Sequence, residues 1–234
     1  MKTLVLLDID GTLLDAQGEG KQGFYEVLER LFPGVAFPEI DMAGRTDLGI
    51  WEQLLSHLPS PPLAPGFARF AQEYGAVLES RLKANPPREI PGAIDFLASL
   101  DRHADLVPCL VTGNFRDGAR HKLDAMGCWE LFETAGGWGT WGDQVTTKKV
   151  LAKRLLESWW QRHPGPVGAV FLGDTLADLE CATHAGVPCV VVNGNRPAPE
   201  FAVAGAVAVW RDFLEPDNPA ERLRQLSQVL QHLP

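Results

Sequence analysis

The sequence predicts an α/β fold, a doubly wound parallel sheet with an inserted all-helical cap domain. Short apolar runs rich in β-branched residues alternate with amphipathic stretches, which is the order of elements expected of parallel βαβ units. One long segment interrupts this alternation with helical patterns alone. Acidic and polar residues directly follow several of the apolar runs, as expected where an open parallel sheet binds its ligand.

The predicted strands are short apolar runs. The first, Thr3–Leu7, reads TLVLL and ends immediately before an acidic segment. Runs this short and this apolar are typical of strands buried on both faces of a sheet. Four further strands are predicted at Leu106–Val111, Ala169–Leu172, Pro188–Val192 and Ala206–Trp210. A weaker strand is predicted near Glu133–Ala135.

The predicted helices lie between and after these strands. Apolar residues recur at three- and four-residue steps in FLASL, LAKRLLESWW and RLRQLSQVL. This spacing gives one apolar face to each helix. The predicted helices are Gly92–Leu100, Arg116–Met126, Lys149–Trp160, Leu176–His184 and Ala220–Leu233.

Residues 16–88 contain helical patterns and no convincing strand. Proline-rich joints, PSPPLAPG and ANPPREIPG, interrupt and end the segment, because proline disfavours helix both at its own position and at the residue before it. The predicted domains are an α/β core of residues 1–15 and 89–234 and a helical cap of residues 16–88. A cap inserted after the first strand lies over its carboxyl end. We therefore expect a lid, with hinges near Asp15–Gly20 and Pro86–Pro91.

The bulk composition narrows the classes of partner. The formal net charge is −9, and an acidic surface repels nucleic acid. No apolar run is long enough to cross a membrane, and no signal-peptide pattern is present. The four cysteines lack metal-binding spacing and are predicted to be buried thiols, which indicates a cytoplasmic location. A monomer is expected by default, since no helix face is plainly unpartnered.

Acidic and polar residues gather at the predicted strand ends and helix starts. Asp8 and Asp10, in DIDGT, directly follow the first strand, and carboxylates this close repel each other unless a cation or proton separates them. Thr112, in LVTGN, ends another strand, and Asp174 and Asp178, in GDTLAD, follow a third. Because the carboxyl ends of parallel strands share one edge of a sheet, we expect these residues to converge.

The acidic residues at this edge suit a divalent metal ion. Asp8, Asp10, Asp174 and Asp178 would supply hard carboxylate oxygens, and an oxygen site with water suits Mg²⁺. A bound cation would also screen the repulsion between the carboxylates. The sequence therefore predicts a Mg²⁺ site.

The other residues at this edge suit a phosphate group. The expected phosphate-binding groups are the Thr112 hydroxyl and the backbone N–H groups of Gly11, Gly113 and Asn114. A lysine of TTKK, either Lys148 or Lys149, would add positive charge. Lys148 is favoured because it follows Thr147, a candidate N-cap. One carboxylate could then attack phosphorus while its neighbour handles the proton.

DIDGT, LVTGN, the TTKK lysine and GDTLAD resemble, in order, the four motifs of the haloacid dehalogenase-like phosphohydrolases, and the resemblance covers the whole chain. It implies a Rossmann-like core and phosphoryl transfer through an aspartyl-phosphate. Asp8 would be the nucleophile, and Asp10 would protonate the leaving oxygen and then activate water. Asp8, the Asp10 carbonyl and Asp174 would hold Mg²⁺, with Asp178 supporting it.

The helical cap and AGRTD, at Ala43–Asp47, look most similar to the phosphoglycolate phosphatase branch of that superfamily. The resemblance implies that Arg45 reaches from the cap to steer the substrate or its phosphate. The second acid, Asp10, disfavours dehalogenation, because true haloacid dehalogenases expel halide without protonation and lack this acid. The predicted function is a Mg²⁺-dependent phosphomonoester hydrolase acting on a small, phosphoglycolate-like cytosolic metabolite.

Two alternative functions stay open. A phosphosugar mutase of the same superfamily would pass the phosphoryl group from the aspartate to another hydroxyl. A receiver-like binding module also places an acid cluster, a threonine and a lysine around an aspartyl-phosphate, although the large insert argues against it. Asp47 is interpreted as a turn or capping residue rather than a ligand.

Overall fold

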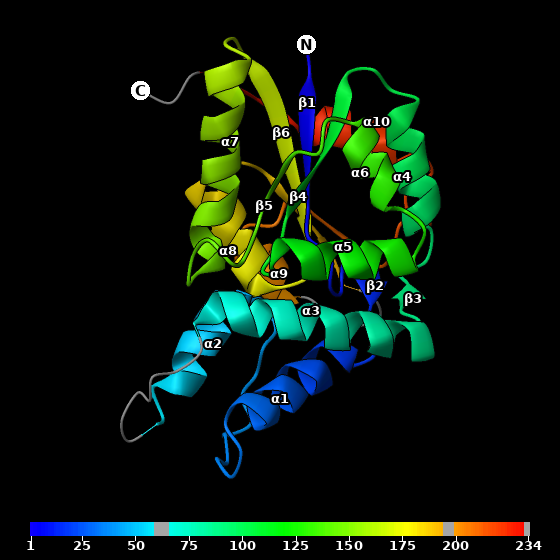
Figure 1. Ribbon diagram of the computed structural model, residues 1–234. Helices are drawn as coiled ribbons and strands as arrows, with labels where there is room; N and C mark the ends of the chain where they lie inside the picture. The colour runs from blue at the N-terminus through cyan, green and yellow to red at the C-terminus, as the bar shows by residue number, and fades with distance from the viewer. Residues whose placement is uncertain (59–65, 194–198, 232–234) are drawn as a thin grey trace.

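The computed structural model describes residues 1–58, 66–193 and 199–231 (Figure 1). Within these residues, seven strands form one sheet: β1 (Thr3–Leu7), β4 (Leu106–Val111), β5 (Gly139–Thr140), β6 (Val167–Gly173), β7 (Cys189–Val192), β8 (Ala208–Trp210) and β9 (Gln228–Leu230). Their order is β5-β4-β1-β6-β7-β8, with β9 also paired to β6. All pairs along this path are parallel. The predicted α/β fold with a parallel sheet is confirmed.

β1 runs through the middle of the sheet and contributes to two hydrophobic cores. Leu4 and Leu6 belong to one buried cluster, and Val5 and Leu7 belong to the other. Successive side chains of a strand point to opposite faces, so a strand covered on both faces needs an apolar residue at every position. This requirement explains why the first strand is a continuous apolar run.

Helices cover both faces of the sheet. On the face of Val5 and Leu7 the core includes side chains of α4 (Ala93–Asp101), α5 (Arg116–Ala125), α6 (Trp129–Thr134) and α10 (Pro219–Leu226). On the opposite face it includes those of α7 (Leu151–Arg162), α8 (Leu176–His184) and α9 (Pro199–Val203). Figure 1 shows α7 and α8 on one side of β1 and α4 and α6 on the other. Each apolar helix stripe is thus buried against the sheet, as the doubly wound pattern requires.

Three helices of residues 16–88 form a layer of their own at the bottom of Figure 1: α1 (Glu19–Leu31), α2 (Asp47–Leu55) and α3 (Phe67–Ala84). Phe70 of α3 lies at their centre, with its ring centroid 4.4 Å from that of Phe24 and 4.6 Å from that of Trp51. Short antiparallel strands, β2 (Leu14–Asp15) and β3 (Arg88–Glu89), join this layer to the core. We call residues 16–88 the helical insert. Most of its predicted joint PSPPLAPG lies outside the described residues.

The strand predicted near Glu133–Ala135 is wrong. This segment belongs to α6 and its end, because Trp129 and Phe132, three residues apart, are both buried on one face of a short helix. Gly136 and Gly137 follow with φ values of 106° and 61°, which other residues rarely adopt. The chain turns there and forms β5 instead.

The helix predicted at Ala220–Leu233 is also wrong in its second half. α10 ends at Leu226, and β9 runs antiparallel to Val167–Ala169 of β6. β6 pairs with β7 only from Phe171 onward, so β9 satisfies backbone groups that would otherwise be unpaired on that side of β6. The last residues of the prediction, from 232 onward, lie outside the described part of the chain.

The structure bears on two expectations from the composition, the state of the cysteines and the presence of membrane-spanning helices. The cysteines, Cys109, Cys128, Cys181 and Cys189, are buried free thiols, as predicted. None of the helices in the described ranges combines the length and the hydropathy that a membrane span requires.

Candidate active site

The predicted site residues meet at the carboxyl edge of the sheet, where the core faces the helical insert. A cavity of about 450 Å³ lies between the two. The core contributes Asp8, Asp10, Thr112, Lys148 and Asp174 to its lining. Arg45, from the segment before α2, lines the same cavity from the insert side. Gly11, Gly113 and Asn114 also lie on its wall.

Lys148 is the lysine that the structure places beside the acids. Its side chain is buried, and its Nζ atom lies 2.7 Å from Asp8 Oδ1 and 2.6 Å from Asp178 Oδ1. Burial alone favours a neutral amine, but Asp178 and Asp8 outweigh it and hold the pKa of Lys148 above its usual value. Lys149 instead pairs with Glu180 at the surface.

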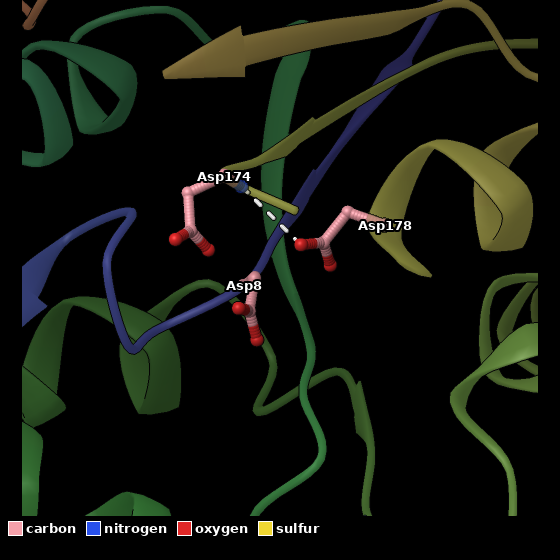
Figure 2. Close-up of side chains that lie close together, drawn as sticks. All are labelled: Asp8, Asp174 and Asp178. Atoms are coloured by element: carbon pink, nitrogen blue, oxygen red, sulfur yellow. Dashed lines mark hydrogen bonds between the residues drawn. The ribbon is translucent and has the colours of Figure 1, made fainter. Parts of the chain in front are cut away.

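Asp8, Asp174 and Asp178 bring carboxylate oxygens within 4.8 Å of one another (Figure 2). Asp8 directly follows β1 and Asp174 directly follows β6, whereas Asp178 lies in the first turn of α8. The Asp178 carboxylate accepts hydrogen bonds from the Thr175 hydroxyl at 2.6 Å, the Thr175 N–H at 3.0 Å and the Asp174 N–H at 3.2 Å. In return, Asp178 N–H donates to the Thr175 hydroxyl oxygen at 3.3 Å. This reciprocal capping box starts α8 and fixes the Asp178 carboxylate against Lys148.

The clustered acids carry more negative charge than one lysine balances. Burial, opposed by Lys148 and reinforced by Asp178, raises the pKa of Asp8 to about 6. Burial, together with repulsion from Asp178 and Asp8, raises the pKa of Asp174 to about 8. Among the described residues, the buried Asp174 Oδ1 finds no hydrogen-bond donor. Hard oxygens with unrelieved charge are the donor set that Mg²⁺ prefers, so these residues fit the ion.

Gly11 permits the close approach of Asp174. Its φ is +78°, and a Cβ atom there would lie 2.1 Å from Asp174 Oδ2. Its N–H, expected to bind phosphate, donates to the Leu14 carbonyl at 2.8 Å. The position thus requires glycine for both space and backbone conformation.

Asp10 lies in a second polar network, built with the segment after β4. Asn114 Nδ2 donates to Asp10 Oδ2 at 2.7 Å and to Thr112 Oγ1 at 2.8 Å. Lys122 Nζ donates to both Asp10 oxygens at 2.7 Å. Although burial opposes it, the Lys122 charge holds the pKa of Asp10 below its usual range. The Asn114 side-chain amide therefore donates its hydrogen bonds to Asp10 and Thr112 in this structure.

Lys122 is a site residue that the sequence analysis missed. It lies on α5 between Ala119 and Leu123, which are both buried, and its own residue is only 4% exposed. A lysine on the apolar face of a helix is rarely buried unless it is paired. That position on the face of α5 is the signal that could have identified it.

Asp47 connects the helical insert to the core rather than capping a helix. Thr46 is the N-cap of α2, with its hydroxyl accepting from Gly49 N–H at 3.1 Å. Asp47 N–H donates to the Gly113 carbonyl at 2.8 Å, and the Asp47 carboxylate accepts from Phe115 N–H at 2.8 Å. The start of α2 is therefore bound to the segment that carries Thr112.

Glycines make this contact between insert and core close. A Cβ atom on Gly113 would lie 1.9 Å from the Arg45 carbonyl oxygen, and one on Gly49 would lie 2.3 Å from the Thr146 carbonyl oxygen. Arg45 is held over the cavity in this way, and its guanidinium donates to the Asp41 carbonyl at 3.4 Å. Backbone packing of the insert thus decides where Arg45 lies.

A doubly wound sheet with acids at its carboxyl edge and an inserted helical layer next to them defines a class of α/β enzymes with a helical insert. The chain belongs to the haloacid dehalogenase-like hydrolase family, whose model matches residues 5–192. The resemblance seen in the sequence motifs is therefore confirmed.

Individual relatives agree with this assignment. The probable phosphatase IndB of Dickeya dadantii (strain 3937) is 25% identical over 232 residues, 97% of each chain. The structure of CbbY from Rhodobacter sphaeroides in complex with phosphate matches with a TM-score of 0.71 at 22% identity, covering 94% of this chain and 98% of that chain. A predicted phosphoglycolate phosphatase from Haemophilus somnus 129pt matches with a TM-score of 0.63 at 16% identity, covering 91% and 95%. The two structures share the fold.

Proposed function

We propose that the chain is a Mg²⁺-dependent phosphatase that hydrolyses a small phosphomonoester through an aspartyl-phosphate on Asp8. The observation that carries the proposal is the position of Asp8, 2.7 Å from Lys148 Nζ, clustered with Asp174 and Asp178 and lining one cavity with Asp10. A nucleophilic carboxylate beside cations and beside a second acid is the arrangement that phosphoryl transfer requires.

In the first step an oxygen of the Asp8 carboxylate attacks phosphorus, and the bond between phosphorus and the leaving oxygen breaks. Asp10 gives its proton to that oxygen. The lowered pKa keeps Asp10 ionised in the ligand-free protein, but a bound phosphate anion nearby favours its protonation. Thr112, whose hydroxyl oxygen already accepts from Asn114, keeps its own O–H free to donate to a phosphoryl oxygen.

In the second step water attacks the phosphorus of the acyl phosphate. Asp10, now ionised, takes a proton from that water, and Asp8 leaves as a free carboxylate with inorganic phosphate as the product. Lys148 stays within hydrogen-bond distance of Asp8 and balances its charge in both steps.

Asp8, the Asp10 carbonyl and Asp174 would hold Mg²⁺, with Asp178 supporting the site through Lys148 and the start of α8. The bound ion would supply positive charge to the phosphoryl oxygens and relieve the repulsion among the carboxylates. The raised pKa values of Asp8 and Asp174 support this assignment.

The substrate is proposed to be a small metabolite that carries a second anionic group, as phosphoglycolate does. Arg45 lines the insert side of the cavity, and its guanidinium donates a long hydrogen bond, 3.4 Å, to the Asp41 carbonyl. Such a guanidinium can bind a carboxylate or a second phosphate. The insert would act as the lid, hinged where β2 and β3 join it to the core.

Phosphate release from a panel of phosphomonoesters tests the proposed function. The panel pairs small phosphate esters that differ only in a second anionic group, and each is assayed with Mg²⁺ and with excess EDTA. We expect Mg²⁺-dependent release that is fastest, by kcat/KM, for the esters with two anionic groups. Release that EDTA leaves unchanged would contradict the metal assignment. Conversion of phosphosugars to isomers without phosphate release would establish the mutase instead.

A further inference from the structure

Lys122 is a buried lysine that has no role in the two reaction steps described above. It is 4% exposed, and an ammonium group pays a large desolvation cost at such a position unless it is paired. It contacts Asp10, and its charge also acts on Asp47, where burial outweighs it and raises the pKa of that carboxyl to about 6. The burial of a lysine against one particular acid suggests that the lysine also has a role in the reaction of that acid.

All three N–H groups of Lys122 have acceptors within the protein. These are Asp10 Oδ1 at 2.7 Å, Asp10 Oδ2 at 2.7 Å and Asn114 Oδ1 at 2.6 Å. An ammonium group has three donors, so none remains for a substrate. Lys122 can therefore act on the reaction only through its partners.

The Asn114 side chain closes the network from the other side. Its two amide hydrogens go to Asp10 and Thr112, and its oxygen accepts from Lys122. Asp10 itself immediately precedes a turn, and its side chain is 43% exposed, so packing alone does not fix it. The orientation of its carboxylate is set by hydrogen bonds from Lys122 and Asn114.

The helical insert covers the Lys122 ammonium group. A Cβ atom on Gly20 would lie 3.6 Å from Lys122 Nζ and 3.4 Å from the Tyr74 hydroxyl, and that hydroxyl donates to the Gly20 carbonyl at 3.0 Å. The backbone of α1 at Gly20 therefore lies close to the ammonium group. Contacts between opposite charges are stronger where water is excluded.

We propose that Lys122 is a positioning residue that holds the Asp10 carboxylate in the orientation needed for proton transfer. This inference rests on the proposed function, because it assigns Asp10 the proton-transfer step. Proton transfer requires hydrogen-bond distance to the reacting oxygen, so a rotated Asp10 loses its contribution while Asp8, Lys148 and the metal ligands are unaffected.

The test compares leaving groups in Lys122→Met, with Arg120→Met as the matched control. Arg120 is on the same helix but exposed, and it pairs only with Asp124. For an alkyl phosphate, whose leaving oxygen needs a proton, we expect kcat of Lys122→Met to fall about 100-fold or more with little change in KM, since proton transfer contributes roughly 10²–10⁴-fold. For dinitrophenyl phosphate, whose leaving group needs no proton, the phosphorylation rate should change little. Arg120→Met should match the wild type.

A double-mutant cycle separates positioning from general structural support. In an Asp10→Asn background, Lys122→Met should cause no further loss of alkyl phosphate turnover, because the residue that it positions is already disabled. Lys122→Arg should recover part of the activity, because it keeps the charge and can donate to both oxygens. If Lys122→Met does not fold, Lys122→Gln, which keeps one donor, replaces it and should give an intermediate loss.

Three outcomes would overturn the inference. They are an unchanged Lys122→Met enzyme, equal losses of the phosphorylation rate for both leaving groups, and additive losses in the cycle. An inactive wild type would instead overturn the proposed function, and this inference with it. The two failures are therefore distinguishable by the wild-type assay alone.

Discussion

Asp8→Asn is expected to abolish phosphate release, with kcat reduced at least about 10⁴-fold, because removal of a covalent nucleophile leaves only binding and electrostatic effects. An amide is nearly the same size as a carboxylate but is a poor nucleophile toward phosphorus. Asp8 also lies against Lys148 at 2.7 Å, so the variant loses one charge from a cluster that has an excess of negative charge. Folding should therefore be retained or improved while turnover is lost.

The measurement is phosphate release with Mg²⁺, together with the thermal midpoint of unfolding. Asp41→Asn serves as the control, because Asp41 is an exposed acid whose carboxylate accepts a local hydrogen bond from Ala43 N–H. This control should match the wild type in both measurements. An Asp8→Asn enzyme with more than a few per cent of wild-type kcat would contradict the assignment of Asp8.

Lys148→Met is expected to cause the largest loss of stability among single substitutions at the site. The variant leaves Asp8 and Asp178 buried without their shared cation, and breaking a buried ion pair from one side costs about 3–5 kcal/mol. For a chain of this size, such a loss lowers the midpoint of thermal unfolding by roughly 6–20 °C. Uptake of a proton by one of the acids would limit the loss, so the lower end is expected at acidic pH. Turnover should also fall sharply, because the charge of Lys148 no longer balances the nucleophile.

Lys149→Met is the matched control for stability. Lys149 pairs with Glu180 at the surface, and exposed pairs contribute about 0–1 kcal/mol. Thermal unfolding in EDTA compares the variants without help from a metal ion. Equal midpoints for the two lysine variants would show that Lys148 does not compensate the buried acids.

Local motifs made much of the site predictable. Asp8, Asp10, Thr112 and Asp174 were identified because each follows a short apolar strand, and parallel strand ends meet at one edge. The choice between Lys148 and Lys149 depended on a single residue of register at the start of a helix. The structure places Lys148 beside the acids, because Thr147 accepts from Lys149 N–H and begins a 3₁₀ turn that buries Lys148.

Features that depend on distant segments were not predictable in this way. Lys122 contacts Asp10 across more than a hundred residues of sequence, and Asp47 joins the segment after β4 only because α2 packs there. β9 forms because the first residues of β6 extend beyond its pairing with β7. This register between distant strands is not contained in any local sequence pattern. In α6 the burial of Trp129 and Phe132 on one face decided between helix and strand.

The central claim is that Asp8 carries the phosphoryl group, and trapping that adduct tests it most directly. Asp10→Asn should accept a phosphoryl group from dinitrophenyl phosphate, whose leaving group needs no proton, but should release it slowly because no base activates water. After acid quench, mass spectrometry of the peptides should find one phosphoryl group on the peptide that contains Asp8 and none in the Asp8→Asn/Asp10→Asn double variant. A phosphoryl group on another residue, or steady phosphate release with no adduct, would contradict the account.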